Sequence, residues 1–426
     1  MTSAPGSPAR AADAPTRRVL LLGATGSIGR QTVEVVAHLA ALARAEGRAA
    51  PLEIVGLAAG RKARTLFEMA GRLGVRDLAI AREPGDAQPP PGSRLRTGPD
   101  GAERLVREVE ADIVVGAMVG AAGLPATLAA LELGRDVALA NKETLVAAGS
   151  LVVDAARHTG ARLLPVDSEH SAAWQCLAGS VCPPCALGPE VRRLVLTASG
   201  GPFRETALDA MRAATPEQAL DHPTWSMGPK VTVDSASLMN KALEVIEAHW
   251  LFGLEAERIG VLVHPGSIVH ALVEYADGSV VAQLGAPDMR TPIQHALTWP
   301  ARWPGLAPAP DLAALGALPF EEADEERFPA VALAREVIRL GGVAGAALNG
   351  ANEAAVEAFL AGRIPFGRIV ELGAAALREL AGARPRGPVG SLAEAMEADR
   401  AARAIVAAQL GAGRARASHA PASKGR

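Results

Sequence analysis

The stretch Arg18-Val-Leu-Leu-Leu-Gly-Ala-Thr-Gly-Ser-Ile-Gly29 decides the fold class, because an apolar, buried-type strand runs directly into a glycine-rich turn. An amphipathic helix through about Ala43 follows the turn. Strand, turn and helix together form the first unit of a dinucleotide-binding fold, in which a pyrophosphate lies on the helix N-terminus. The glycine spacing is G-x-x-G-x-x-G, not G-x-G-x-x-G, so a tight turn without a ligand is the alternative.

The second expected strand, residues 52–58, indicates which nucleotide fits. NAD-specific folds place an acidic residue near the end of this strand, where it binds the ribose 2′-hydroxyl. Here Gly60-Arg61-Lys62 follows, with no acid nearby. Two cations suit a 2′-phosphate, so the sequence predicts NADP(H). A basic helix start on the surface is the alternative.

Further strands are expected near residues 77–81, 112–118, 136–140 and 162–166, with helices between them. Strands that alternate with helices predict a parallel, doubly wound sheet of the Rossmann type. Ligands of such sheets bind beyond the carboxyl ends of the strands. Two polar segments lie in that position, Asn141-Lys142-Glu143 and Asp167-Ser168-Glu169.

The second of these segments closes the stretch Leu163-Leu-Pro-Val-Asp-Ser-Glu-His170. Carboxylates two residues apart at the end of an extended run project the same way, because strand side chains alternate with period two. We therefore expect Asp167 and Glu169 to supply half of a site for Mg²⁺ or Mn²⁺, which prefer oxygen ligands. A solvated loop of charged residues is the alternative.

After about Arg192 the pattern changes. Asp277-Gly278 lies between apolar runs at 269–275 and 279–284, which is a strong hairpin signal. Antiparallel pairing there predicts a second domain of α+β type.

The stretch Asp234-Ser-Ala-Ser-Leu-Met-Asn-Lys-Ala-Leu-Glu244 is expected to open one helix that runs to about Phe252. Asn240 and Glu244, four residues apart, share a helix face. Glu244 can supply a third oxygen to the metal, while Ser235, Asn240 and Lys241 offer donors to a phosphate. An ordinary solvent-facing surface is the alternative.

The segment His222-Pro-Thr-Trp-Ser-Met-Gly-Pro-Lys230 precedes that helix. An indole and a thioether among small polar residues fit a loop that closes over a ligand and excludes water. A loop anchored by one core tryptophan is the alternative.

The remaining chain completes an α/β organisation with a helical C-terminal domain. Residues 300–319 carry five prolines and are expected to form a linker, and helices are expected at 329–340, 352–360, 369–380 and 392–410. The predicted division is a disordered tail (1–16), a nucleotide-binding domain (17–166), a metal and substrate domain (167–299), a linker (300–325), a helical domain (326–410) and a second tail (411–426).

Composition bounds the class of protein. With 426 residues, 49% of them apolar and 21% charged, the chain is expected to be soluble and globular. A net charge of −3 argues against a nucleic-acid or membrane-surface protein, and no stretch resembles a signal peptide or membrane span. The cysteines, Cys176, Cys182 and Cys185, do not suggest a disulfide framework, so we expect a reducing cytoplasm. Cys182-Pro-Pro-Cys185 is expected to be a surface loop without redox function.

The chain closely resembles the 1-deoxy-D-xylulose 5-phosphate reductoisomerases from about Arg18 to Leu410. The resemblance rests on motifs in the same order: GATGSIG (23–29), MVGAAG (118–123), LANKETLV (139–146), LLPVDSEH (163–170), SGGPFRET (199–206), HPTWSMG (222–228), KVTVDSASLMNKALEVIEAHWLF (230–252), GAPDMRTPI (285–293) and ALNGANEAAV (347–356). Gly266 and Pro229 depart from the family pattern, which commonly has glutamine and a basic residue there.

The resemblance implies three sets of site residues. A divalent cation (Mg²⁺, Mn²⁺ or Co²⁺) would be held by Asp167, Glu169 and Glu244. Substrate would contact Lys142, Ser168, Glu169, Ser199, His222, Ser235, Asn240, Lys241 and Glu244, with Trp225 in a closing flap. NADPH would contact Thr25, Gly26, Ser27, Ile28, Gly60, Arg61, Lys62, Asn141, Glu143 and Gly228. Lys142 and Glu169 would assist proton movements beside the metal ligands, in a homodimer.

The activity that the resemblance implies is the rearrangement and NADPH-dependent reduction of 1-deoxy-D-xylulose 5-phosphate to 2-C-methyl-D-erythritol 4-phosphate, in the non-mevalonate isoprenoid pathway. A plain NADP-dependent dehydrogenase of another phosphorylated aldehyde or ketone is the alternative, and it predicts hydride transfer that survives EDTA. A catalytically silent NADP-binding sensor would be expected to lack at least one carboxylate of the set, yet all three are present.

Overall fold

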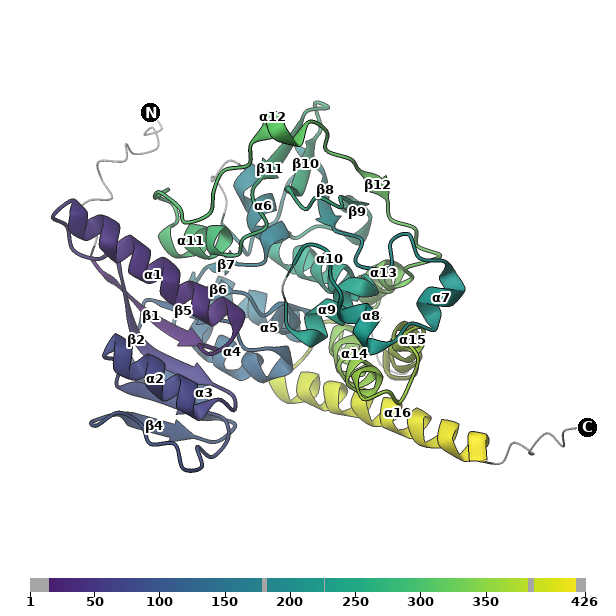
Figure 1. Ribbon diagram of the computed structural model, residues 1–426, viewed down its shortest axis with the longest axis horizontal. Helices are drawn as coiled ribbons and strands as arrows, with labels where there is room; N and C mark the ends of the chain where they lie inside the picture. The colour runs from purple at the N-terminus through teal and green to yellow at the C-terminus, as the bar shows by residue number, and fades with distance from the viewer. Residues whose placement is uncertain (1–14, 178–181, 226, 382–386, 419–426) are drawn as a thin grey trace, which may run out of the picture.

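The computed structural model describes residues 15–177, 182–225, 227–381 and 387–418. A seven-stranded, all-parallel sheet forms its N-terminal part (Figure 1). Its strands are, in spatial order, β4 (Arg94–Thr97), β3 (Asp77–Ile80), β2 (Leu52–Ala59), β1 (Arg17–Leu22), β5 (Ile113–Gly116), β6 (Asp136–Leu139) and β7 (Leu163–Pro165). The order runs outward in both directions from β1, so the predicted doubly wound sheet is confirmed.

Helices alternate with these strands, as the sequence pattern predicts. They are α1 (Ser27–Ala45), α2 (Ala63–Leu73), α3 (Gly101–Glu108), α4 (Leu124–Glu132), which a short 3₁₀ turn (Gly120–Gly123) precedes, and α5 (Lys142–Thr159). The edge strand β4 was not predicted, because its sequence, Arg-Leu-Arg-Thr, has one apolar residue between two arginines. Long polar side chains are typical of edge strands and leave little hydrophobic signal.

A second sheet of five strands follows. In spatial order its strands are β11 (Val280–Leu284), β10 (Val269–Tyr275), β8 (Val191–Ala198), β9 (Ile259–Val263) and β12 (Glu321–Glu322). The β10–β11 hairpin turns at Asp277-Gly278, with Gly278 at φ +88°, so that prediction is also confirmed. Helix α6 (Ser168–Cys176) packs against β10 and β11, and α11 (Arg290–Thr298) lies beside α1 (Figure 1). Two short helices, α7 (Leu208–Arg212) and α8 (Pro216–Leu220), and a 3₁₀ turn (Ala256–Arg258) complete this part.

The predicted single helix from Asp234 to Phe252 is wrong. Two helices occupy that stretch, α9 (Pro229–Ala236) and α10 (Met239–Phe252), and Leu238 between them has a left-handed backbone with φ +54°. The apolar periodicity continues across the break, so the sequence pattern did not reveal it. Pro229 is the first residue of α9, where its missing N–H costs nothing.

The C-terminal part is helical, as expected. It contains α13 (Ala330–Leu340), α14 (Ala344–Leu360), α15 (Arg368–Ala381) and α16 (Leu392–Ser418), and α14 packs against both α15 and α16 (Figure 1). The predicted tail from Gly411 is wrong in part, because α16 continues to Ser418 before residues 419–426, which lie outside the described residues. The proline-rich segment contains α12 (Leu312–Leu315), and β12 directly after it pairs with β9.

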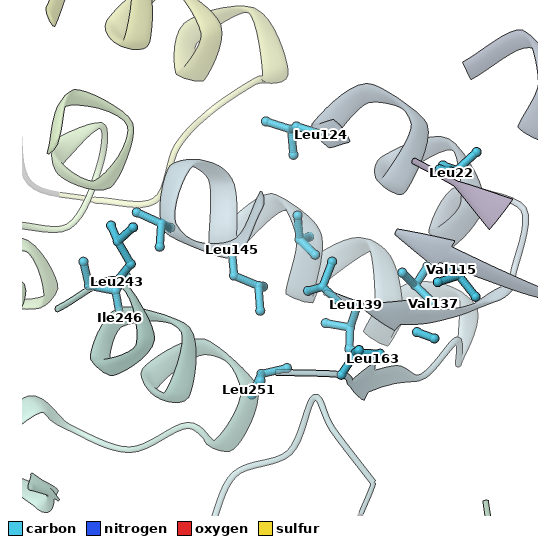
Figure 2. Packing of buried hydrophobic residues seen from close by; sticks show 14 of the residues in the cluster. Leu22, Val115, Leu124, Val137, Leu139, Leu145, Leu163, Leu243, Ile246 and Leu251 are labelled. Atoms are coloured by element: carbon cyan, nitrogen blue, oxygen red, sulfur yellow. The ribbon is translucent and has the colours of Figure 1, made fainter. Parts of the chain in front are cut away.

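One hydrophobic core joins the N-terminal sheet to α10. Figure 2 shows Leu163 of the sheet near Leu251 of α10, and Leu145 of α5 between Leu139 of the sheet and Leu243 of α10; all five belong to one core. Each such buried leucine contributes about 1.5–3 kcal/mol of hydrophobic stabilisation. This core fixes α5 against α10.

A glycine lets these two helices approach closely. A Cβ added at Gly149 of α5 would lie 2.3 Å from the Trp250 indole of α10, so only glycine fits there. The first residue of α5 thereby comes within reach of the first turns of α10.

Candidate active site

Three carboxylates converge where α5, α6 and α10 meet. Asp167 is the N-cap of α6 and accepts a hydrogen bond from Ser168 N, while Glu169 lies in the first turn of α6. Glu244 projects from α10 and is 1% exposed. The predicted meeting of Asp167 and Glu169 therefore occurs, but the predicted reason, alternation along a strand, is wrong. Strand β7 ends at Pro165, and a helix start brings the two side chains together.

Two buried lysines hold the three carboxylates. Lys142 Nζ lies 2.5 Å from Asp167 Oδ2 and donates to Glu244 Oε1 at 2.8 Å. Lys241 Nζ donates to Glu169 Oε1 at 2.7 Å and also to Glu244 Oε2. Two ammonium groups against three carboxylates leave one net negative charge in a buried space, and such a cluster attracts a cation.

The geometry of the carboxylates fits a divalent metal. One oxygen from each of Asp167, Glu169 and Glu244 can be chosen so that all lie within 4.8 Å of one another. Hard oxygen donors in this number suit Mg²⁺ or Mn²⁺ with substrate or water in the remaining positions. The residues present therefore fit the cation that the sequence predicts.

The carboxyl groups have divergent pKa values. Burial raises the pKa of Asp167 to about 7, and the charges of Glu244 and Glu169 add to that effect against the attraction of Lys142. Burial also opposes ionisation of Glu169, but Lys241 and Lys142 outweigh it and lower its pKa to about 2. Carboxylates whose environments separate their pKa values in this way are typical of sites that move protons.

A second pair of polar groups lies behind the cluster and was missed by the sequence reasoning. His170 Nε2 donates to the backbone oxygen of Glu244 at 2.9 Å, and its Nδ1 lies 3.5 Å from Glu247 Oε2. Glu247 is fully buried, and its pKa is raised well above the usual range, chiefly by burial. The available signal was the spacing, since Glu247 follows Glu244 by three residues on one helix face.

A polar triad stands apart from the carboxylates. His222 Nε2 lies 3.1 Å from both Ser199 Oγ and Ser235 Oγ. His222 Nδ1 accepts hydrogen bonds from the backbone N–H groups of Thr224 and Trp225, so in the neutral ring the proton resides on Nε2. Three of the predicted substrate contacts are thus brought together.

Further predicted substrate contacts lie on the carboxylate side. Asn240 Nδ2 donates to Glu244 Oε1, and Asn240 Oδ1 accepts from Lys142. Ser168 Oγ donates to Glu169 Oε2 at 2.6 Å. The side chains of the predicted substrate set therefore form two hydrogen-bonded groups.

The predicted flap is represented by its half-buried residues Trp225 and Met227, with Ser226 outside the described residues. The Trp225 ring lies 6.3 Å from the ring of His270. The segment ends at Gly228, directly before α9.

The predicted nucleotide contacts lie at the carboxyl edge of the parallel sheet. Gly23 directly follows β1 with φ +87°, and a Cβ there would lie 2.2 Å from Ala117 O, so the turn requires glycine. The N-cap of α1 is Gly26, which has no side chain to cover the first turn. The open N–H groups of this turn, formed with Thr25, Ser27 and Ile28, are suited to a phosphate.

The remaining nucleotide residues follow β2 and β6. Gly60, Arg61 and Lys62 are exposed after β2, and within the described ranges neither basic side chain has a hydrogen bond or ion pair. Asn141 and Glu143 follow β6, and Asn141 Nδ2 donates to Glu143 Oε2 at 2.9 Å. Gly228 lies on the flap side and is exposed. Free cations at one end of the edge and a buried polar pair at the other fit the two ends of a dinucleotide.

Family models match most of the chain. The model described as 1-deoxy-D-xylulose 5-phosphate reductoisomerase matches residues 19–149, and two models of reductoisomerase C-terminal domains match residues 163–252 and 284–405. The protein of that name from Anaeromyxobacter dehalogenans is 47% identical over 412 residues, which is 96% of this chain and all of the relative. The chain belongs to the 1-deoxy-D-xylulose 5-phosphate reductoisomerase family. A further relative, from Mycobacterium avium, is 51% identical over 83% of both chains.

Solved structures of the reductoisomerase family have the same fold. One, from Zymomonas mobilis in complex with NADPH, is 40% identical with a TM-score of 0.81 and covers 93% of this chain and 99% of its own. Another, in complex with NADPH, fosmidomycin and magnesium, is 37% identical with a TM-score of 0.83 and covers 93% and 98%. The α/β fold class predicted from the sequence is confirmed on this ground as well.

Proposed function

We propose that this chain converts 1-deoxy-D-xylulose 5-phosphate to 2-C-methyl-D-erythritol 4-phosphate, with NADPH as reductant and a divalent cation as cofactor. The observation that carries the proposal is the cluster of Asp167, Glu169 and Glu244 around Lys142, beyond the carboxyl end of a parallel sheet. A plain dehydrogenase does not need three carboxylates and two lysines in one buried cluster. A reaction that rearranges a carbon skeleton does, because charge develops on substrate oxygens.

Each group in the cluster has a chemical role in this proposal. A bound cation supplies Lewis-acid stabilisation of the negative charge that develops on substrate oxygens. Lys142 reaches the same space with an ammonium group that can hydrogen-bond a substrate hydroxyl. Glu169, ionised and hydrogen-bonded by Ser168, can accept a hydrogen bond from that hydroxyl and orient it.

Phosphate binding is assigned to the Ser199–His222–Ser235 triad together with Asn240 and Lys241. The neutral His222 ring presents Nε2–H between two hydroxyls, and such donors suit phosphate oxygens. The pKa of His222 is lowered by burial, so the ring is neutral near pH 7. Binding energy from the phosphate can hold the flap with Trp225 over the reacting carbons.

NADPH is assigned to the sheet edge, where it supplies the hydride for reduction. Arg61 and Lys62 would contact the 2′-phosphate, and Thr25, Gly26, Ser27 and Ile28 the pyrophosphate. Asn141, Glu143 and Gly228 would lie toward the nicotinamide end. In this proposal residues 17–166 bind the nucleotide and residues 167–299 bind metal and substrate.

The test is NADPH oxidation with 1-deoxy-D-xylulose 5-phosphate after EDTA treatment, followed by addition of Mg²⁺, Mn²⁺ or Co²⁺. We expect oxidation only after a cation is restored, product identified as 2-C-methyl-D-erythritol 4-phosphate, and inhibition by fosmidomycin. Hydride transfer that survives EDTA would favour a plain dehydrogenase of another phosphorylated carbonyl compound. Absence of oxidation with every cation would reject the assignment of the substrate.

We also propose that the chain is a homodimer through the free edge of β11. Val280 and Val281 on that edge strand are 55% and 41% exposed. An edge with unpaired backbone groups and apolar side chains is suited to pairing with a second copy. Light scattering after gel filtration tests this: the wild type should be dimeric, and Val280→Lys with Val281→Lys should shift it to monomer. A monomeric wild type would reject the proposal.

A cytoplasmic location is proposed from the chemistry of the thiols. All three cysteines are free, which is typical of proteins in a reducing compartment. Microscopy of a fluorescent fusion tests the location, and fluorescence confined to the envelope would contradict it.

A further inference from the structure

Lys230 lies at the junction of three parts of the chain. It is in none of the predicted metal, substrate and NADPH sets. It is the second residue of α9, directly after the flap segment 222–228 and Pro229. Its Nζ donates to Glu143 Oε1 at 2.7 Å and lies 3.0 Å from Asp234 Oδ2. Glu143 follows β6 of the N-terminal sheet, so one ammonium group connects the start of α9 to the nucleotide edge.

Hydrogen bonds extend this contact on both sides. Glu143 Oε2 accepts from Asn141 Nδ2, which also donates to Gly120 O at 3.1 Å. On the other side, Asp234 Oδ1 accepts from Asn352 Nδ2 of α14 at 2.8 Å. The chain Gly120–Asn141–Glu143–Lys230–Asp234–Asn352 thus ties the sheet edge, the end of the flap and the C-terminal helices together. We call these six residues the Lys230 network.

Burial makes this network dependent on the lysine. The side chains of Glu143, Lys230 and Asp234 are 7%, 18% and 1% exposed. Burial would favour a neutral Glu143, but Lys230 outweighs it and the pKa of Glu143 is lowered. Without the ammonium group two buried carboxylates would face each other, and unpaired buried charges are strongly unfavourable. The position of Glu143 therefore depends on the position of Lys230, and the reverse.

Two consecutive residues at the start of α5 contact the carboxylate cluster and the Lys230 network. Lys142 contacts the carboxylate cluster through Asp167 and Glu244, and Glu143 contacts Lys230. The flap is consequently anchored at both ends: His222 is hydrogen-bonded to Ser199 and Ser235, and Lys230 to Glu143. A nucleotide that fixes the position of Glu143 would therefore also fix Lys230, at the end of the flap.

We propose that Lys230 is a positioning residue that couples nucleotide binding at the sheet edge to the placement of the flap over the substrate. The proposal rests on the function proposed above, and it adds a residue that would touch neither the cation nor the phosphate. Coupling of this kind appears as a change in the affinity for one ligand when the other is bound. Loss of Lys230 should weaken that effect more than it weakens the binding of either ligand alone.

The experiment measures the coupling ratio by calorimetry in excess Mg²⁺. This ratio is the Kd of fosmidomycin without NADPH divided by its Kd with NADPH. A ratio of about tenfold or more is expected for the wild type, within the usual range for coupled sites. Lys230→Met should reduce the ratio to within about twofold of unity, and Lys230→Arg, which keeps the charge, should restore most of it. Arg368→Gln, which breaks an exposed ion pair with Glu371, is the control and should leave the ratio unchanged.

A second variant keeps the test decisive if Lys230→Met does not fold. The double variant Lys230→Met with Glu143→Gln also removes one of the two carboxylates, Glu143 and Asp234, that lose their lysine partner, so it should fold more readily. Its ratio should be no lower than that of Lys230→Met alone, because both changes break the same contact. A wild-type ratio in folded Lys230→Met, or in the folded double variant, would overturn the proposal. So would a parallel loss of NADPH affinity, fosmidomycin affinity and Tm at an unchanged ratio, since that result means structural support only. The ratio is a binding measurement, so it is interpretable even if turnover with the proposed substrate is absent.

Discussion

The carboxylate cluster and the nucleotide edge differ in how their charges are satisfied. Every carboxylate of the cluster has a lysine partner inside the protein, and Glu244 has two. At the nucleotide edge Arg61 and Lys62 are exposed, and the described part of the chain offers their side chains no partner. The first region is preorganised for charge in a buried space, whereas the second is left open for a ligand that brings its own charge.

This difference predicts effects of different size. A change in the cluster alters the balance of buried charges, where interactions are strong because water is excluded. A change at the open edge removes a contact with a ligand and leaves the protein itself unaltered. The following predictions are ordered by the effect expected.

The largest effect is expected for Glu244→Gln. The amide keeps the size of the side chain but removes one of the three proposed carboxylate ligands and the partner of two lysines. We expect kcat to fall by about 10³-fold, the scale on which transition-state charge stabilisation is lost. NADPH affinity, measured by fluorescence titration, should remain within about twofold of wild type. An equal loss of both would mean that Glu244 supports the fold of the two regions together.

A smaller effect is expected when both cations of the open edge are neutralised. In Arg61→Gln with Lys62→Gln, each lost charge-assisted contact with a 2′-phosphate is worth about 1.4 kcal/mol, or tenfold in affinity. The preference for NADPH over NADH, measured as the ratio of kcat/KM values, should therefore fall by about 100-fold, with Tm unchanged. An unaltered preference would mean that the 2′-phosphate binds elsewhere and that the open cations Arg61 and Lys62 do not serve the nucleotide.

A pH effect of about tenfold is expected at the cluster. In the proposed site a cation would bind the ionised form of Asp167, whose pKa is raised to about 7, while Glu169 stays ionised down to about 2. The affinity for Mn²⁺ should therefore be fully developed above pH 7 and decline as pH falls below it, by about tenfold between pH 8 and pH 6. Calorimetric titration of metal-free protein at several pH values measures this, and a flat profile would contradict the separation of the two pKa values.

The smallest effect is expected for the cysteine loop, whose substitution serves as a control for both regions. Burial raises the pKa of Cys182 to about 12 and that of Cys185 to about 11, so neither thiol is reactive near pH 7. Cys182→Ser with Cys185→Ser should leave kcat and both cofactor affinities within about twofold of wild type. A larger loss of turnover would show that the loop contributes to one of the two regions.

Local patterns predicted most of the fold because they record which side chains are buried. The strand and glycine turn at 18–29 and the Asp277-Gly278 hairpin are decided within a few residues, so both were foreseen. The break at Leu238 was not, because its left-handed backbone is held by the packing of α9 and α10 and not by a glycine. Strand β4 was missed since an edge strand with two arginines carries little apolar periodicity.

The site divides in the same way. By itself the sequence determined the residue types: three carboxylates, two lysines, a glycine turn and two free cations, each in a segment whose expected position follows from strand and helix order. Only the tertiary structure decided that Lys142 lies between Asp167 and Glu244, and that Lys230 joins Glu143 to Asp234. Lys142 is 25 and 102 residues from these two partners, and Lys230 is 87 residues from Glu143; only the contact of Lys230 with Asp234, four residues apart within α9, is local. Their meeting depends on the buried core that fixes α5 against α10, and local sequence patterns do not specify how such distant surfaces pack.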